Sequence, residues 1–287
     1  MQPLHQTIKK QAVLLSSHVF NDFIMSGYEK LREAIIEDMD LFLLIEMNEN
    51  DFNIPVSINK FTFSLESLNG LNYIPIAETI LPGSNHFPLF LFYREHPCYA
   101  YYWNIEYDVY CNGDWSALFD AFMPVDSDFL TSHIERYQQT TEWMWWDTLQ
   151  LQTMDIPKAQ YVKSFNPIYR ISNKAMAFLD KVLSEGNFGH HEVLIPTVLN
   201  HAGYKINDWG GMGEFVLPGK ENTVYTTNSN VSNYYYLGSS MRYRPLFYLE
   251  ELESKIKDNL LYHPVKQRKM SNYMSPLVER HCEETST

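Results

Sequence analysis

Cysteine is scarce in this sequence, and the spacing that metal and redox sites use is missing. The 287 residues include three cysteines, Cys98, Cys111 and Cys282, and no CxxC pattern occurs. An odd count without paired spacing favours free thiols in a reducing compartment over a disulfide scaffold. We therefore expect a cytoplasmic protein.

Long apolar runs are missing as well. The N-terminal stretch "MQPLHQTIKKQAVLLSSHVF" has an apolar core of four residues before Ser16, which is too short for the hydrophobic region of a signal peptide. No other segment approaches the apolar length of a membrane span. We expect no transmembrane segment, while peripheral contact with a membrane stays open.

An excess of positive charge is the third absence. Lys and Arg number 22 against 35 Asp and Glu, so the formal net charge is −13, and no basic stripe offsets it. Because contacts to phosphate dominate nucleic-acid binding, a nucleic-acid partner is disfavoured. A small anionic ligand would need a metal ion or a local cluster of Lys and Arg.

The composition that is present indicates a globular α/β protein. Hydrophobic residues make up 45% and aromatic residues 15% of the chain, which excludes a disordered protein. "QAVLLSS" predicts a buried strand that ends near Ser16, and a helix should follow from Asn21 or Asp22 to about Ile36. Residues 41–46 predict a second buried strand. This order predicts a mostly parallel sheet that is covered by helices on both faces.

Later segments add weaker predictions for the same domain. Short strands are expected at 73–78, 88–93, 99–108 and 127–132, and residues 48–72 should be irregular. Helices are expected after Asp114, between Ser172 and Gly186, within 192–202 and over 246–260. Residues 140–150 should form a Trp-rich loop or helix over a cleft, and 208–215 a glycine-rich loop. We expect one domain, residues 1–266, and a polar tail, residues 267–287.

Two acidic residues in the strongest predicted strand need an explanation. Glu106 and Asp108 lie in "YYWNIEYDVYCNGDW", although acidic residues are depleted in strands. Residues two apart point to the same face, and two close carboxylates in apolar surroundings need a partner. A divalent cation such as Mg²⁺ or Mn²⁺ would satisfy them, since hard cations prefer oxygen ligands. The alternatives are a solvated strand edge or pairing with Arg94 or Arg136.

The segment "WNIEYDVY" resembles the metal-binding triplet of GT-A-fold glycosyltransferases, which use nucleotide-sugar donors. The likeness is greatest to a group with a W-x-I-E-Y-D-V motif followed by Gly-x-Trp, which Gly113 and Trp115 match. The resemblance implies a single GT-A-like domain, with the metal that bridges the donor diphosphate on Asp108 and Glu106. Asp108 is the better direct ligand, because Glu replaces the first Asp of the usual triplet.

The stretch "FGHHEVLIPTVLNHAGYKINDWGG" suggests a catalytic base. Inverting GT-A enzymes carry an acidic motif here, before a helix that ends in Ala-Gly-Tyr, and "HAGYKI" resembles that ending. By this resemblance Glu192 is the base and His191 the second candidate. The alternatives are a zinc site on His190, His191 and a third ligand, or a surface cluster that caps the helix. Pro196 would break this helix unless the helix begins near Leu194.

The C-terminal motif "YHPVK" resembles the segment that completes the metal shell in several GT-A families. By this resemblance His263 is the third metal ligand and Lys266 contacts the diphosphate; the alternative is a turn at Pro264 with an exposed Lys. Ser16 and Ser17 close the first predicted strand, where parallel sheets bind ligands, and Glu46 closes the second. These residues are candidate donor contacts. Weaker candidates are Arg242 and Arg244 for phosphate, and Asp208 and Trp209 for an acceptor sugar.

Together these features predict a metal-dependent glycosyltransferase that needs Mn²⁺ or Mg²⁺. The enzyme would be hexosyltransferase-like and inverting, and would move a sugar from a nucleotide-sugar donor to a hydroxyl acceptor on a glycan or polysaccharide. Two other classes remain as alternatives. One is a metal-dependent, carbohydrate-active hydrolase that uses the histidine pair, and the other is a sugar- or nucleotide-binding protein without catalysis.

Overall fold

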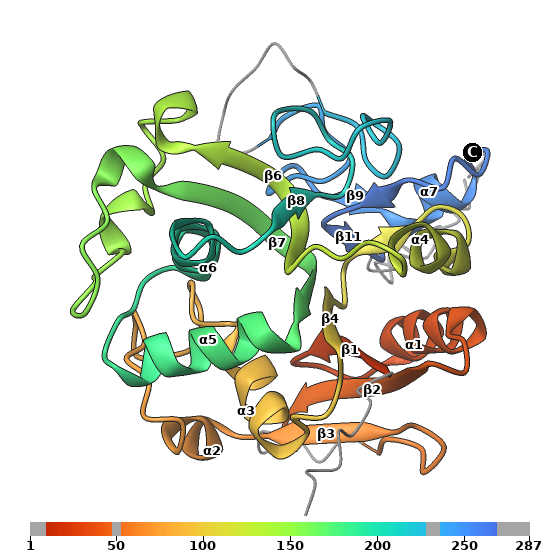
Figure 1. Ribbon diagram of the computed structural model, residues 1–287. Coiled ribbons are helices and arrows are strands. Elements are labelled where there is room, and N and C mark those ends of the chain that lie inside the picture. Colours follow the sequence, from red (N-terminus) through yellow and green to blue (C-terminus); the bar gives the residue numbers. More distant parts are fainter. Residues whose placement is uncertain (1–9, 48–52, 228–235, 269–287) are drawn as a thin grey trace, which may run out of the picture.

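A central sheet of seven strands organises the protein (Figure 1). The computed structural model describes residues 10–47, 53–227 and 236–268. The strands of the sheet are β1 (Gln11–Ser17), β2 (Met39–Glu46), β3 (Lys60–Phe63), β4 (Tyr101–Glu106), β6 (Phe129–Arg136), β7 (Val162–Ser172) and β8 (Ile206–Asp208). Their order is β3-β2-β1-β4-β7-β6-β8, and β7 alone is antiparallel to its neighbours. The expected α/β class with a mostly parallel sheet is confirmed.

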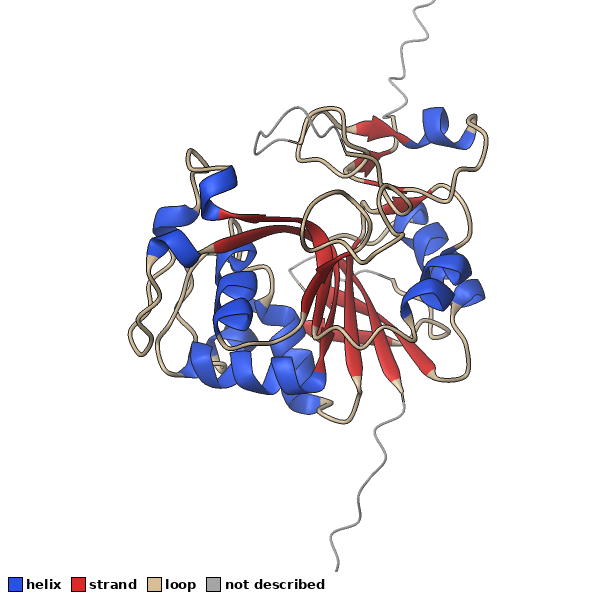
Figure 2. Ribbon diagram, turned by 45° about the horizontal axis from the view of Figure 1, so that its top comes forward, coloured by secondary structure: helices blue, strands red, loops and turns tan. Residues whose placement is uncertain are grey.

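Helices cover both faces of this sheet (Figure 2). Helices α1 (Asp22–Ala34) and α4 (Trp115–Phe122) lie on one face. Helices α3 (Phe87–Glu95), α5 (Asn173–Ser184) and α6 (His191–His201) lie on the other, with the short α2 (Leu65–Asn69) near its edge. Three short 3₁₀ turns (Tyr137–Gln139, Trp146–Thr148 and Lys158–Gln160) precede β7.

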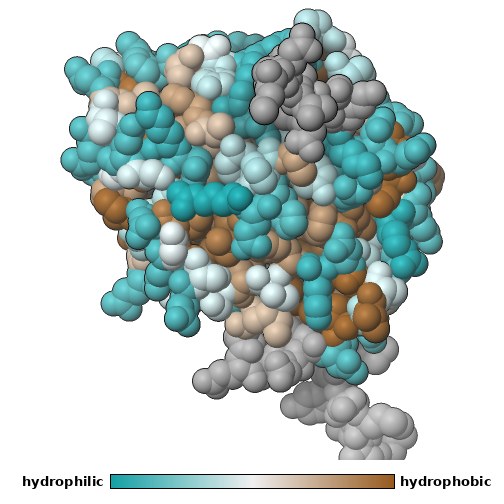
Figure 3. Space-filling model, turned by 60° about the horizontal axis from the view of Figure 1, so that its bottom comes forward, coloured by the Kyte–Doolittle hydropathy of each residue, from teal (hydrophilic) through white to brown (hydrophobic). Residues whose placement is uncertain are grey.

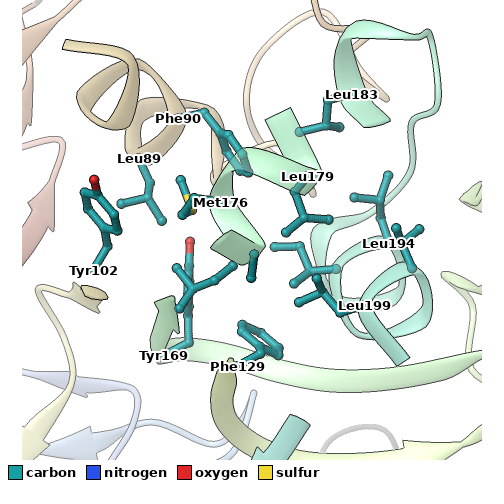
Figure 4. Packing of buried hydrophobic residues seen from close by; sticks show 14 of the residues in the cluster. Leu89, Phe90, Tyr102, Phe129, Tyr169, Met176, Leu179, Leu183, Leu194 and Leu199 are labelled. Carbon is teal, nitrogen blue, oxygen red and sulfur yellow. The ribbon is translucent and has the colours of Figure 1, made fainter. Parts of the chain in front are cut away.

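The alternation of side chains along β1 creates two hydrophobic cores. Ala12 and Leu14 pack with the helices of one face, whereas Val13 and Leu15 pack with α1 and α4 on the other. Successive residues of a strand point to opposite faces, so a strand that is apolar throughout must be covered twice. Figure 4 shows the first core, in which α3, α5 and α6 bring leucine, phenylalanine and methionine side chains onto β4, β6 and β7.

The strand order creates a switch point between β1 and β4. From β1 the chain moves outward through β2 to β3, and then returns to place β4 on the other side of β1. In the register of this pair Ser16 lies beside Glu106, so both strands end at the same level. Ligands of open α/β sheets bind at the carboxyl ends of strands where the order reverses in this way.

Two small sheets attach the C-terminal segment to the end of β4. β5 (Tyr110–Cys111) pairs antiparallel with β10 (Leu261–Tyr262), and β9 (Phe247–Tyr248) pairs parallel with β11 (Val265–Lys266). The N–H of Val265 also donates to the carbonyl of Asp108 at 2.9 Å. These bonds place the residues between β10 and β11 next to the acidic end of β4.

Several sequence predictions are confirmed by these elements. The expected strands at 11–16, 41–46 and 99–108 are β1, β2 and β4, and the strand expected at 127–132 is the first half of β6. Asn21, Asp114 and Ser172 each cap the helix that follows, as α1, α4 and α5 show. Gly186 and Gly203 follow α5 and α6 in the left-handed conformation that favours glycine at helix ends.

Other sequence predictions are wrong. Residues 88–93 lie in α3, because a continuous apolar run buried on all sides fits a core helix as well as a strand. Residues 73–78 form a loop, and the region expected to be irregular contains β3 and α2. The helix expected over 246–260 is only α7 (Leu249–Glu253), and β7 was not predicted at all. Helix α6 begins at His191 and contains Pro196.

The domain boundaries remain a prediction, and most of the expected tail lies outside the described residues. None of the described helices combines the length and apolar character needed to cross a bilayer.

On the face of β3 and α2, apolar and polar surface alternate (Figure 3). Large apolar side chains exposed in this part of the chain are Val56, Leu65 and Ile74. Peripheral membrane contact stays a prediction.

Candidate functional site

Three candidate metal ligands meet at the end of β4. Nε2 of His263 lies 3.6 Å from Oε2 of Glu106 and 3.5 Å from Oδ1 of Asp108. One ligand atom from each of the three residues lies within 4.8 Å of the other two. In the described ranges, no other set of three His, Cys, Asp or Glu side chains comes as close together. Glu106 ends β4, and Asp108 follows in the turn before β5. The structure thus brings together the two acids and a histidine 155 residues later in the chain.

A backbone carbonyl group holds the imidazole ring of His263 in its orientation. Its Nδ1 lies 3.0 Å from the carbonyl oxygen of Arg242, so Nδ1–H donates and Nε2 faces the two carboxylates. Burial alone would lower the pKa of His263, but the carboxylates of Asp108 and Glu106 outweigh it and raise the pKa to about 10. A hydrogen bond from the outer nitrogen to a carbonyl is the usual support of a metal-binding histidine. The two carboxylates are donors that suit Mn²⁺ or Mg²⁺, whereas an imidazole is more typical of Zn²⁺ and other transition metals.

Lys266 provides the remaining charge around Asp108. Its Nζ lies 2.8 Å from Oδ2 of Asp108 and 2.6 Å from the hydroxyl of Tyr107. Burial would raise the pKa of Asp108, but His263 and Lys266 hold it well below its usual range. The proposed partners Arg94 and Arg136 pair elsewhere, with Asp180 and Glu214 respectively. The acids are therefore neutralised by residues of the C-terminal segment.

Two pockets meet at this cluster. One has a volume of about 720 Å³ and extends toward α6, and the other, of about 400 Å³, lies over the ends of β1 and β2. Both are lined by Leu81, Asn85, Glu106 and Asp108. We call them the α6 pocket and the β1 pocket. A metal ion on these acids would therefore face both pockets at once.

The predicted donor contacts line the β1 pocket. Ser16, Ser17 and Glu46 all lie there, at the ends of β1 and β2. The hydroxyl of Ser16 donates to Oδ1 of Asn104 at 2.6 Å, and that of Ser17 donates to the carbonyl of Val19 at 2.7 Å. Both hydroxyls are thus held by the protein, and of these three residues only Glu46 has no hydrogen-bond partner for its side chain among the described residues.

Glu192 lies in the wall of the α6 pocket, in the first turn of α6. Its Oε1 accepts the backbone N–H of Asn166 at 3.2 Å. Burial raises the pKa of Glu192 to about 8, despite that hydrogen bond and the nearby charge of Lys163. A carboxylate with a raised pKa is a better proton acceptor than an exposed one. Its role as the base stays a prediction.

Three imidazoles stack beside this carboxylate. The ring of His191 lies 5.8 Å from that of His86 and 5.0 Å from that of His190, with both pairs nearly parallel. Nδ1 of His190 accepts the N–H of Glu192 and so caps α6. Burial lowers the pKa of His86 and of His190 to about 3 in each case. The cap is buried, not at the surface, and the described residues contain no metal-binding cluster that includes these histidines.

Asp208 and Trp209 line neither the α6 pocket nor the β1 pocket. Trp209 is fully buried and stacks on Trp103 of β4, with ring centroids 5.3 Å apart. Asp208 is buried among hydrogen-bond donors. The glycine-rich loop is therefore a structural support beneath β4. Of the two weaker phosphate candidates, Arg244 lines the α6 pocket, whereas Arg242 lies over the ring of Phe247.

Sequence reasoning missed several residues of the site. Nδ2 of Asn85 donates to Oε1 of Glu106 at 3.0 Å, and Asn85 Oδ1 is buried without a partner among the described residues. Trp145 lines the α6 pocket and stacks on His190 at 4.5 Å. The Trp-rich segment was expected over a cleft, but no local pattern singles out Asn85, because its partner lies 21 residues away on another element.

No family model matches the chain, and no curated protein does either. Solved structures with some similarity include a glycosyltransferase involved in glycosylation of the major capsid of PBCV-1, at 10% identity and a TM-score of 0.32, covering 61% of this chain and 66% of that one. The chain thus spans slightly less than two thirds of that protein.

Two nucleotidyltransferases show a similar likeness. A putative glucose-1-phosphate thymidylyltransferase from Bacillus anthracis is 11% identical, with a TM-score of 0.40 and coverage of 71% of this chain and 87% of that one. The inositol-1-phosphate CTP transferase from T. maritima is 8% identical, with a TM-score of 0.39 and coverage of 70% and 84%. Because these likenesses are distant, we base the function on the residues of the site.

Proposed function

We propose that this protein is a metal-dependent glycosyltransferase that moves a sugar from a nucleotide-sugar donor to a hydroxyl acceptor. The observation that carries the proposal is the position of the cluster of Glu106, Asp108 and His263. It lies at the switch point of the sheet and faces two pockets that differ in lining. A transferase needs two binding sites that share one reaction centre, and two pockets that meet at one cluster of ligands support this proposal.

The β1 pocket suits the nucleoside part of the donor. Its volume of about 400 Å³ falls within the range of small-molecule sites, and its lining combines apolar side chains with a few polar groups. Phe63, Ile80 and Pro88 offer apolar contacts for a base, and Glu46 offers a carboxylate for a ribose or base N–H or O–H group. The diphosphate would then extend toward the cluster that both pockets share.

The cluster would hold Mn²⁺ or Mg²⁺ through Glu106, Asp108 and His263. A bound divalent cation neutralises the charge that develops on a leaving diphosphate. Lys266 can add a second positive charge there, because its Nζ already lies against Asp108 at the edge of the α6 pocket. In a protein with a net charge of −13, such local cations are needed to bind an anionic donor.

The α6 pocket suits the acceptor and the transferred sugar. Trp143, Trp145 and Tyr236 lie in its lining, and aromatic rings bind the apolar faces of sugars. Glu192 lies in the same wall and would take the proton of the attacking hydroxyl. That hydroxyl oxygen would then form the new bond to the anomeric carbon as the bond to the diphosphate breaks. Attack from the side opposite the leaving group would make the enzyme inverting.

A thermal-shift panel tests the proposal. UDP, GDP, CDP and their sugars are each added with and without Mn²⁺, and ligands that bind the folded state raise the Tm. At a hundredfold excess over Kd the gain is about 2.7 kcal/mol, or roughly 5–10 °C for a domain of this size. We expect one nucleotide to give such a shift only with Mn²⁺, and Asp108→Asn to lose it.

The matched control is Asp120→Asn, since Asp120 is exposed on α4 and away from both pockets. This variant should respond as wild type does. A shift with Zn²⁺ alone would favour a hydrolase, and nucleotide binding without transfer or hydrolysis of any donor would favour a binding protein. No shift with any nucleotide, in either metal condition, would contradict the proposal.

A further inference from the structure

The contacts at the two ends of the amide of Asn166 in β7 favour one orientation of its oxygen and its NH₂ group. Its Oδ1 accepts the hydroxyl of Thr131 at 2.7 Å and that of Ser164 at 2.7 Å. Its Nδ2 then lies 3.4 Å from the carbonyl oxygen of His191. The reverse orientation would place the amide oxygen against that carbonyl oxygen with no proton between them. Because all of these residues are buried, we take the orientation that gives both the oxygen and the NH₂ group a partner, in which the NH₂ group faces His191.

This orientation decides which nitrogen of His191 carries the proton. Nδ2 of Asn166 lies 3.3 Å from Nδ1 of His191, and an NH₂ group can only donate. Nδ1 must therefore accept, which places the single proton of a neutral imidazole on Nε2. The ring stays neutral because burial, together with the neighbouring imidazoles of His190 and His86, lowers the pKa of His191 well below its ordinary value.

The protonated nitrogen is left for a ligand. His191 lines the α6 pocket next to Glu192. Within the described ranges, Nδ1 has Asn166 as its partner and Nε2 has none. Nε2 is also not among the buried polar atoms that lack a partner, so it is open to the pocket.

We infer that Asn166 is a positioning residue that fixes His191 as the Nε2–H tautomer, so that the α6 pocket contains a neutral hydrogen-bond donor beside the carboxylate of Glu192. A ligand hydroxyl between them can donate its proton to Glu192 while its oxygen accepts from His191. This pair selects a hydroxyl over an amine or a carboxylate, and it makes His191 a donor, not the base. The role of His191 as a donor to a substrate hydroxyl rests on the proposed function, whereas the assignment of its tautomer does not depend on that function.

Nitrogen NMR of the free protein tests the tautomer without any substrate. In protein labelled with ¹⁵N-histidine, long-range ¹H–¹⁵N spectra separate protonated from unprotonated ring nitrogens. The signals of His191 are assigned by their loss in His191→Gln. We expect Nδ1 unprotonated and Nε2 protonated throughout pH 6–8. A proton on Nδ1, a mixture of tautomers or a charged ring in wild type would overturn the inference.

Asn166→Asp tests what sets the tautomer. The carboxylate keeps the acceptor for Thr131 and Ser164, but it replaces the donor with an acceptor, so Nδ1 of His191 should become protonated. The matched control is Asn69→Asp on the surface of α2, which should leave the spectrum unchanged. An unprotonated Nδ1 in folded Asn166→Asp would refute the role of Asn166. If this variant does not fold, the wild-type spectrum still decides the tautomer.

Kinetics then test the use of the donor, with the nucleotide-sugar found in the thermal-shift panel. A Gln side chain can place an N–H near the position of Nε2, so His191→Gln should retain more activity than His191→Ala, by about tenfold or more in kcat for transfer. Equal losses in the two variants would refute the donor role. A protein with the expected tautomer that binds no nucleotide would instead contradict the proposed function, so the two failures can be told apart.

Discussion

The buried carboxylate of Asp208 offers a prediction whose size follows from its contacts. Oδ1 accepts the N–H groups of Gly210 and Gly211 at 3.0 and 2.9 Å, and Oδ2 accepts that of Ile134 at 3.2 Å. The hydroxyl of Tyr225 donates to both oxygens at 2.9 and 2.8 Å. Asp208 thus joins β8, β6 and the glycine-rich loop through hydrogen bonds that all need an acceptor.

Asp208→Asn should therefore destabilise the protein although it removes a buried charge. Its oxygen can keep the two glycine contacts, but its NH₂ group then faces the N–H of Ile134, and that donor is left unsatisfied. A lost hydrogen bond to a charged group costs about 1.5–3 kcal/mol, and an unsatisfied buried donor about 1–3 kcal/mol. Because relief of the buried charge offsets part of this sum, we expect a loss of about 3 kcal/mol, or about 6–12 °C in Tm.

Urea denaturation and calorimetry would measure this effect without any knowledge of the substrate. Asp126→Asn is the control, since Asp126 is exposed and pairs with Lys205 at the surface, so this variant should be as stable as wild type. Asp208→Ala should be worse than Asp208→Asn, because it removes every acceptor. An Asp208→Asn protein within about 0.5 kcal/mol of wild type would refute the hydrogen-bond reasoning.

Three further predictions concern the site and the core. Asp108→Asn should abolish sugar transfer and Mn²⁺-dependent nucleotide binding while the protein remains folded; full activity in a transfer assay would contradict the metal assignment. Burial raises the pKa of Glu192 to about 8, above the value of about 4.3 in an unfolded chain, so its proton stabilises the fold at low pH and this stabilisation is lost as the pH rises through 8. The free energy of unfolding should thus fall more between pH 5 and 8.5 in wild type than in Glu192→Gln, and equal falls would contradict the raised pKa. Leu179→Ala in α5 should cost about 2–5 kcal/mol in urea denaturation, because its fully buried side chain fills the core of Figure 4; a loss below about 1 kcal/mol would show that the core collapses around the gap.

Local sequence patterns were sufficient to predict the strands and helices that have a clear apolar run or a capping residue. β1, β2 and β4 are apolar runs of strand length, and α1, α4 and α5 each follow a capping Asn, Asp or Ser. Helix α3 has no such signal, because the side chain of its first flanking residue, His86, makes no capping hydrogen bond and the helix is apolar on most sides. Its apolar run therefore resembled a strand.

β7 could not be predicted because its two charged residues have partners that lie far away in the sequence. All eleven of its residues are buried, including Lys163 and Arg170. Lys163 pairs with Glu135 of β6 at 2.9 Å, and Arg170 donates to the carbonyls of Phe122 and Val125 at the end of α4. Charged side chains in a sequence window indicate an exposed segment, and only the tertiary structure supplies the acceptors that make burial possible.

The candidate site likewise contains residues that the sequence could reveal and residues that only the tertiary structure reveals. Glu106 and Asp108 could be singled out because acids in an apolar strand conflict with their local surroundings, whereas Glu192 was singled out by the resemblance of its segment to the acidic motif of inverting GT-A enzymes. Asn85 and Asn166 conflict with nothing nearby in sequence, yet Asn85 contacts the first of these acids, and Asn166 contacts the third and its neighbouring histidine. A sequence therefore reveals the groups that bear charge, whereas the neutral amides that orient them are found only when the strands and helices are assembled. In this protein the side-chain amide of Asn85 donates to Oε1 of Glu106, and the backbone N–H of Asn166 donates to Oε1 of Glu192. We infer that the side-chain amide of Asn166 in turn leaves Nε2 of His191 free for a ligand.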